Sequence, residues 1–273
     1  MYSISKKKLK IKKLRKKTSL GFMDCKNALS KAKGNIEKAI EILKKKGKKI
    51  AISRIKNNNQ GSVITKINKK NNIGIILKIN CETDFVANNN FFKKIIFDIS
   101  KKAIKCNSIK KLLKYKINNI TIKEYIIEKM NIIGEKIEIT QFEKINAPFI
   151  SSYTHHNNKI ASLVGFSFYI KGIEKIAKNI AMQITAMNPI AIKKLDSSLI
   201  EKEKKIIKMQ LLKNNNIPKH IINNIIEGKI QKFFSEKILI YQNFIKNNDL
   251  TVDKYLKTFN SELKILSFKR VEI

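Results

Sequence analysis

An apolar run that leads directly into a polar corner and an amphipathic segment restricts the fold of this chain more than any other feature. Residues 73–81 (IGIILKINC) are almost continuously apolar, as is typical of a buried strand. The polar corner Glu82-Thr83-Asp84 follows. Beyond it, apolar residues recur at helical spacing: Phe92, Ile95, Ile96, Ile99 and Ala103. The pattern predicts a strand, a sharp corner and a helix with one buried face.

The residues of the corner have two interpretations. Thr83 or Asp84 is suited to cap the helix, because its side-chain oxygen accepts a hydrogen bond from a free backbone N–H group. Phe85 precedes Phe92 by seven residues and fits the core face of the helix. A strand–helix corner is also a place where a rigid scaffold presents a side chain to a partner. Periodicity alone does not choose between core and surface for Phe85.

The remaining patterns predict an α+β protein with several parts. We expect a three-helix docking module over residues 1–47, a linker over 48–60, a first α+β subdomain over 61–147 and a second over 148–273. Antiparallel strands are expected at 62–68, 73–81 and 136–144, then at 151–155, 160–170 and 267–273. Longer helices are expected at 121–133 and 174–187.

A helical hairpin over residues 196–234 is predicted to project from the second subdomain. Each of its two helices carries an apolar stripe, and the two stripes are expected to pack against each other. The predicted inner stripe consists of Ile206, Ile207, Leu211, Ile221, Ile225, Ile226, Ile230 and Phe233.

The charge of the chain suggests nucleic-acid binding, but its distribution weakens that interpretation. The formal net charge is +37, from 58 basic and 21 acidic residues. Only Arg15, Arg54 and Arg270 are arginines, although arginine is favoured for bidentate phosphate recognition. The lysines are spread along the chain, and the abundance of Lys, Ile and Asn indicates a genome biased toward A/T-rich codons. A basic RNA- or ribosome-binding adaptor therefore stays an alternative function.

No motif for covalent chemistry stands out, so we expect neither an enzyme nor a bound cofactor. The chain has no GxxxxGK[ST] or GxGxxG loop. Cys25, Cys81 and Cys106 match no zinc or redox spacing and are interpreted as free thiols. The adjacent His155 and His156 point in different directions on either a strand or a helix, which is poor metal geometry. No stretch approaches the roughly 20 apolar residues of a membrane span, and no signal peptide is evident, so a cytoplasmic protein without membrane contacts is expected.

Three segments resemble the elongation factor Ts family. The string NCETDFVA at residues 80–87 is similar to the family's signature. LRKKTSLGFMDCKNALSKAKGNIEKAIEILKKKG at 14–47 resembles its N-terminal module, which has a ubiquitin-associated-like three-helix fold, and KNIAMQITAMNP at 178–189 resembles a second signature. Phe22 stands where the family often has Met. Longer members carry a further C-terminal helical module; this chain ends at Ile273, so contacts of that module are expected to be absent or replaced.

The resemblance implies a guanine-nucleotide exchange factor that binds elongation factor Tu in its GDP-bound and nucleotide-free states. It would disturb the partner's Mg²⁺ and phosphate site and promote GDP release, so that GTP can bind. No specific nucleic acid is expected, and a homodimer or a 2:2 complex with the partner is left open. The residues implied for displacing Mg²⁺ from the partner are Thr83, Asp84, Phe85 and Val86. Those implied for binding the partner's nucleotide domain are Lys12, Arg15, Phe22, Met23 and Lys26, and His155 is implied to contact its third domain.

Overall fold

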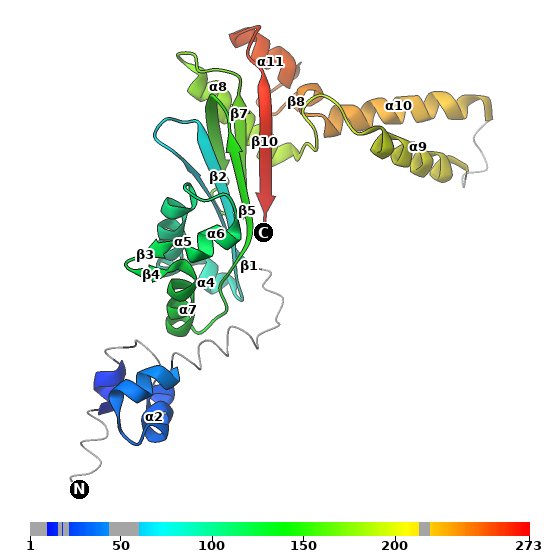
Figure 1. Ribbon diagram of the computed structural model, residues 1–273. Coiled ribbons are helices and arrows are strands. Elements are labelled where there is room, and N and C mark those ends of the chain that lie inside the picture. Colours follow the sequence, from blue (N-terminus) through cyan, green and yellow to red (C-terminus); the bar gives the residue numbers. More distant parts are fainter. Residues whose placement is uncertain (1–9, 16–17, 19–21, 44–59, 213–218) are drawn as a thin grey trace. The chain divides into compact units, whose positions relative to one another are not determined.

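A computed structural model describes residues 10–15, 18, 22–43, 60–212 and 219–273 (Figure 1). The described residues combine helices with antiparallel strands, which confirms the predicted α+β class. None of their helices is both long and apolar enough to cross a membrane. The chain divides into two compact units, one of residues up to Ile64 with Leu77–Phe142, the other of Thr65–Ile76 with Glu143–Glu272. The predicted domain boundaries stay a prediction, and most of the predicted linker lies outside the described residues.

The N-terminal part contains three helical segments among its described residues: 10–15, α2 (Phe22–Lys31) and 36–43. Gly34 has a φ of +81° and reverses the chain after α2. The Asn35 side-chain oxygen then accepts hydrogen bonds from the backbone N–H groups of Glu37 and Lys38, which caps the next helix. The small core that the segments share consists of Ile11, Leu14, Cys25, Ala28, Leu29, Ala32, Ala39 and Leu43.

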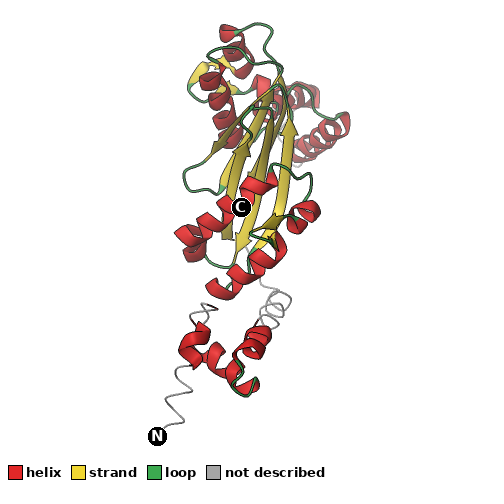
Figure 2. Ribbon diagram, turned by 60° about the vertical axis from the view of Figure 1, so that its left-hand side comes forward, coloured by secondary structure: helices red, strands yellow, loops and turns green. Residues whose placement is uncertain are grey.

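A three-stranded sheet follows, with the strand order β1-β2-β5 (Figures 1 and 2). Its strands are β1 (Gln60–Ile67), β2 (Ile73–Cys81) and β5 (Glu138–Asn146). The consecutive residues Ile75, Ile76 and Leu77 are all fully buried, so both faces of the central strand β2 are covered. Gly61 allows β1 to approach β2 closely, because a Cβ atom there would lie 2.2 Å from the Ile79 carbonyl oxygen.

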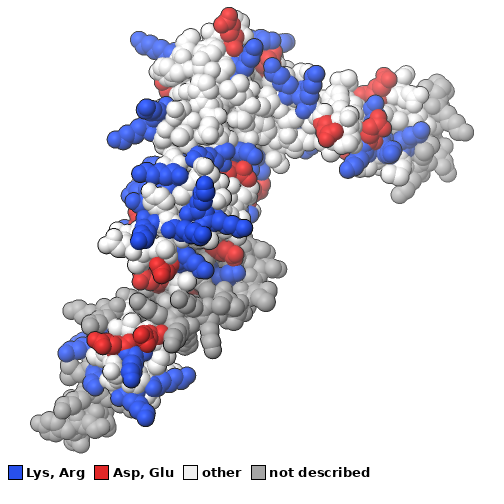
Figure 3. Space-filling model, viewed as in Figure 1, with Lys and Arg blue, Asp and Glu red and all other residues white. Residues whose placement is uncertain are grey.

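Four helices belong to the first unit: α4 (Asp84–Asn88), α5 (Asn90–Ala103), α6 (Ile109–Lys114) and α7 (Ile122–Ile133). All five side chains predicted for the inner face of α5 are buried. A capping box between Thr121 and Glu124 starts α7, and Gly134, with a φ of +83°, ends it. In Figure 3 lysine and arginine side chains gather over the region of α5 and α6.

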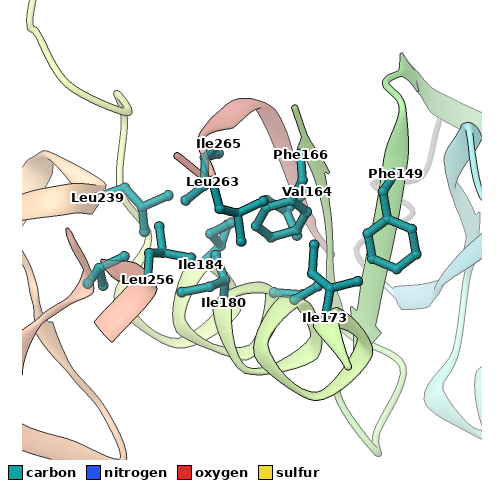
Figure 4. Close-up of a cluster of buried hydrophobic side chains, with 13 residues drawn as sticks. Phe149, Val164, Phe166, Ile173, Ile180, Ile184, Leu239, Leu256, Leu263 and Ile265 are labelled. Carbon is teal, nitrogen blue, oxygen red and sulfur yellow. The ribbon is translucent and has the colours of Figure 1, made fainter. Parts of the chain in front are cut away.

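The second unit is built on a sheet with the order β10-β7-β6, formed by β6 (Phe149–Thr154), β7 (Ile160–Phe166) and β10 (Ile265–Glu272). Both neighbouring pairs are antiparallel, and β10 closes the sheet as predicted. Helix α8 (Ile173–Met187) packs on this sheet, and Figure 4 shows Ile173, Ile180 and Ile184 facing Val164 and Phe166. Strand β7 ends earlier than predicted, at Phe166, because Phe168 and Ile170 pack against the core from a loop.

Helices α9 (Ser197–Leu212) and α10 (Lys219–Lys237) form the predicted hairpin, which extends from the second unit (Figure 1). The predicted stripe was wrong at two positions, because Ile206 and Ile221 are exposed. The buried contacts are made by Ile207, Leu211, Ile222 and Ile230, with Ile225, Ile226 and Phe234 packed against them. Along α10 the stripe includes the predicted Ile226 and Ile230, but it begins at Ile222 where Ile221 was predicted and includes Phe234 where Phe233 was predicted. The four-residue spacing places these side chains on one helical face, which meets α9.

Several short elements were not predicted from the sequence. They are α6, the hairpin β3 (Lys116–Ile117) and β4 (Ile120–Thr121), the 3₁₀ helix η1 (Leu239–Tyr241), the hairpin β8 (Asn243–Phe244) and β9 (Asn247–Thr251), and α11 (Val252–Phe259). Each is too short for hydrophobic periodicity to identify it. In the second unit Leu239, Val252 and Leu256 complete the core beside α8, as Figure 4 shows for Leu239 and Leu256.

Candidate functional site

The corner after β2 presents Phe85 to solvent. Its side chain is 83% exposed, whereas Phe92 is fully buried. Asn89 separates the two residues, because it ends α4 and its side-chain oxygen caps α5 by accepting from the Phe91 N–H at 2.8 Å. The chain therefore does not continue as one helix, and Phe85 does not join the core face. Of the two interpretations of Phe85, the surface one is correct.

Thr83 fixes the start of α4. Its backbone is extended, with φ −122° and ψ 157°, and its hydroxyl oxygen accepts a hydrogen bond from the Val86 N–H at 3.4 Å. The predicted capping role of Thr83 is thus confirmed. Ala87 faces inward and is buried, Val86 is half-buried, and Asp84 and Phe85 lie on the exposed side of this short helix.

The corner is tied to the turn after α7 by a carboxylate that the sequence analysis missed. The Glu135 Oε2 atom accepts hydrogen bonds from the backbone N–H groups of Glu82 at 3.2 Å and Thr83 at 3.0 Å. Its Oε1 atom accepts from the Thr83 hydroxyl at 2.6 Å. In return, Glu82 Oε1 accepts from the backbone N–H of Lys136 at 3.0 Å. No local sequence pattern predicts a contact between residues this far apart in the chain.

Aromatic and basic side chains cluster on α5 and α7 in the same unit. The ammonium group of Lys129 lies 4.8 Å from the ring centre of Tyr125 and 5.8 Å from that of Phe91. Burial raises the pKa of Tyr125, and the nearby carboxylates of Asp98 and Glu128 raise this pKa further. The Tyr125 ring offers the lysine a cation–π partner. This cluster was not predicted from the sequence.

In the N-terminal part, the aromatic and thioether side chains at the start of α2 are exposed. Phe22 is 45% exposed and Met23 58% exposed, whereas Cys25 is fully buried. Phe22 and Met23 therefore do not belong to the buried core of this part. Lys26 is exposed and follows them by one helical turn, so the three side chains share a surface of α2.

Two further residues that were predicted for partner binding also lie on the surface of this part. Lys12 and Arg15 are both exposed on the helical segment 10–15. Nothing in their local geometry distinguishes them from an ordinary solvated face.

His155 lies in the second unit, just after β6, and is exposed. Its Nδ1 atom is 3.5 Å from the Tyr153 hydroxyl, and its ring contacts that of His156 edge-on. Together with Tyr153, Met182 and Arg270 it lines a cavity of about 340 Å³. Among the described residues, no group of three or more His, Cys, Asp or Glu side chains could hold a metal ion. The geometry of His155 suits surface recognition.

The structure thus brings the implied site residues together in separate groups. Thr83, Asp84, Phe85 and Val86 form the corner, and Phe22, Met23 and Lys26 share α2. His155 belongs to the second unit. The thiols of Cys25, Cys81 and Cys106 are buried and form no disulfide among the described residues.

Comparison with known proteins points to one family. The family model described as Elongation factor TS matches residues 82–273, a stretch that begins at the corner. The chain is 40% identical over 266 residues to Elongation factor Ts of Christiangramia forsetii and 40% identical over 266 residues to that of Flavobacterium psychrophilum. Each alignment covers 96% of this chain and 97% of the relative. Elongation factor Ts of Clostridium kluyveri is 36% identical over 278 residues, with 96% of this chain and 90% of the relative covered. The chain belongs to the elongation factor Ts family.

Proposed function

We propose that this protein accelerates GDP release from elongation factor Tu by inserting Phe85 beside the partner's Mg²⁺ site. The exchange role follows from the family. The observation that carries the residue assignment is an 83% exposed phenylalanine on a helix start whose backbone is held by hydrogen bonds. Because its own chain does not bury this apolar side chain, burying it against a partner can contribute free energy to binding.

The mechanism requires differential affinity and no covalent chemistry. Mg²⁺ demands near-ideal octahedral coordination, so a small displacement of its ligands in the partner costs much of its binding. Phe85 would occupy an apolar pocket only in the partner conformation in which those ligands are displaced. Asp84, exposed beside it, would interact with the polar groups that the displacement releases. Coupling of this kind is reciprocal. GDP with Mg²⁺ must therefore weaken the partner's affinity for this protein by the same factor by which this protein weakens the partner's affinity for GDP with Mg²⁺.

The surfaces outside the corner would serve to hold the partner. Phe22, Met23 and Lys26 with Lys12 and Arg15 would bind its nucleotide domain, and His155 its third domain. Attachment at several points makes insertion of Phe85 effectively intramolecular. We place this activity in the cytoplasm, where translation takes place.

Stopped-flow release of labelled GDP from elongation factor Tu tests the proposal. The release rate should rise with the concentration of this protein and saturate. Raising GDP and Mg²⁺ together should dissociate the complex, as reciprocal coupling requires. An unchanged release rate at saturating protein would overturn the proposal.

One observation favours a second candidate function, RNA binding. The segment from Ile99 to Lys123, which includes α6, contains no acidic residue. It carries eight lysines: Lys101, Lys102, Lys105, Lys110, Lys111, Lys114, Lys116 and Lys123. Elsewhere, as on α9, acidic and basic residues alternate. A lysine surface of this kind attracts a phosphate backbone.

Salt dependence distinguishes this candidate. The logarithm of the binding constant for a labelled single-stranded RNA should fall linearly with the logarithm of salt concentration. Replacing Lys110, Lys111 and Lys114 by Ala should reduce that slope, whereas the same change at Lys202, Lys204 and Lys205 on α9 should reduce it less. Equal effects of the two triple variants would show general charge attraction and exclude a dedicated site.

A further inference from the structure

The turn between α7 and β5 supplies long-range hydrogen bonds to the corner. Glu135 accepts three hydrogen bonds there, from the backbone N–H groups of Glu82 and Thr83 and from the Thr83 hydroxyl. A carboxylate suits this place because it is an acceptor only and has two oxygens. The Thr83 hydroxyl donates its hydrogen to Glu135 and keeps a lone pair free for the Val86 N–H. The bonds thus form a chain in which each one polarises the next.

The corner needs such support because its own helix is very short. Helix α4 has five residues, and helices shorter than about 12 residues are marginal when isolated. Phe85 is almost fully exposed, so packing within the chain does not fix its direction either. The turn that carries Glu135 is fixed from its own side, because the left-handed Gly134 ends α7 there. The Lys136 N–H also donates to Glu82, so the two segments are joined in both directions.

We propose that Glu135 is a positioning residue that orders the Thr83–Val86 corner before the partner binds. This inference rests on the proposed function and deepens it. With Glu135 in place, the backbone that carries Phe85 is already in its binding conformation, and less ordering entropy is lost on insertion. Without Glu135, water replaces the carboxylate and the corner samples other conformations.

Two variants of Glu135 and one control test the inference. Glu135→Ala removes all three acceptors. Glu135→Gln keeps one oxygen for the backbone N–H pair but turns an amide donor toward Thr83, so it should retain part of the effect. Glu138→Ala is the matched control, because Glu138 is a nearby exposed glutamate whose ion pair is with the Lys136 ammonium at 2.7 Å. Thermal unfolding of each variant establishes that it is folded.

Amide hydrogen exchange on the free protein gives the first readout. In Glu135→Ala the amides of Glu82, Thr83 and Val86 should exchange about tenfold faster or more, as local opening becomes easier. The amides of the buried face of α5 should keep their rates, and Glu138→Ala should match the wild type throughout. Unchanged exchange at the three corner amides would overturn the inference whatever the activity.

The second readout is GDP release in a double-mutant cycle with Phe85. Glu135→Ala should slow catalysed release about tenfold when Phe85 is present, because ordering must then occur on binding. In a Phe85→Ala background the same change should have almost no further effect, and Glu135→Gln should fall between Glu135→Ala and wild type. Independent, multiplicative effects would show that Glu135 acts elsewhere and would overturn the positioning role, as would release at the wild-type rate.

Measurements on the wild-type protein distinguish failure of the proposed function from failure of the positioning role. If wild type itself does not accelerate GDP release, the proposed function fails, and the positioning inference fails with it. If wild type is active and the corner amides are unaffected by Glu135→Ala, only the positioning inference fails.

Discussion

At Phe85 the chain leaves a large apolar side chain in water. Burying a phenylalanine side chain is worth about 1.5–3 kcal/mol, and this free energy is not used for folding here. The neighbouring Ala87 is buried, so a place on the inner side of α4 exists, but Phe85 does not occupy it. The exposed phenylalanine therefore contributes little to stability and is available for recognition.

Replacing Phe85 by Ala should separate activity from stability. Catalysed GDP release should slow roughly ten- to a hundredfold, the equivalent of the burial free energy that is lost. The melting temperature should stay within error of the wild type, because the side chain is exposed.

Phe92→Ala is the contrasting variant. Phe92 is fully buried in α5, so its truncation should lower the free energy of unfolding by about 3–5 kcal/mol in urea titrations. If Phe85→Ala destabilised the protein to the same extent, the assignment of Phe85 to the surface would be wrong.

At the scale of elements, hydrophobic periodicity was sufficient for the long helices and most strands. The inner face of α5 and the extent of α8 followed from spacing, because each buries one continuous stripe. The hairpin α9–α10 shows where this reasoning stops. Helix α10 has isoleucines at both 221 and 222 and at both 225 and 226, and adjacent apolar residues define a wide stripe without a unique centre. Packing against α9 selects Ile222 and exposes Ile221.

Paired substitutions in α10 test this register. Ile222→Ala should lower the stability of the hairpin by about 2–4 kcal/mol, because it removes a buried side chain. Ile221→Ala, one position earlier and exposed, should change it by less than about 1 kcal/mol. Hydrogen exchange of α9 and α10 amides measures both effects. A larger loss of stability for Ile221→Ala than for Ile222→Ala would contradict this register and support the stripe predicted from the sequence.

At the scale of the whole molecule, recognition groups are distributed over separate parts of the chain. The exposed pair Phe22 and Met23 belongs to α2, whereas Phe85 belongs to the corner after β2. If α2 docks the partner and Phe85 changes its conformation, the two groups affect different kinetic quantities. Docking sets the concentration at which exchange saturates, and insertion sets the maximal rate.

Replacing both Phe22 and Met23 by Ala should therefore raise the half-saturating concentration about tenfold or more while the maximal rate of GDP release stays close to that of the wild type. The core of the module should remain folded, because Cys25, Ala28 and Leu29 supply its buried contacts from α2. Lys33→Ala is a suitable control, since Lys33 is exposed in the turn after α2. An unchanged half-saturating concentration would exclude docking through this surface.

The sequence by itself determined the α+β class, the strand–corner–helix order around Thr83, the presence of a capping residue at the corner and the family signature, because these depend on local spacing and on residue types. Only the tertiary structure decided that Phe85 faces solvent, since that depends on the break at Asn89. It also decided which face of α10 meets α9 and revealed that Glu135 holds the corner. The face of α10 and the role of Glu135 depend on contacts between residues far apart in the chain, and no local pattern encodes which of several suitable side chains the fold brings together.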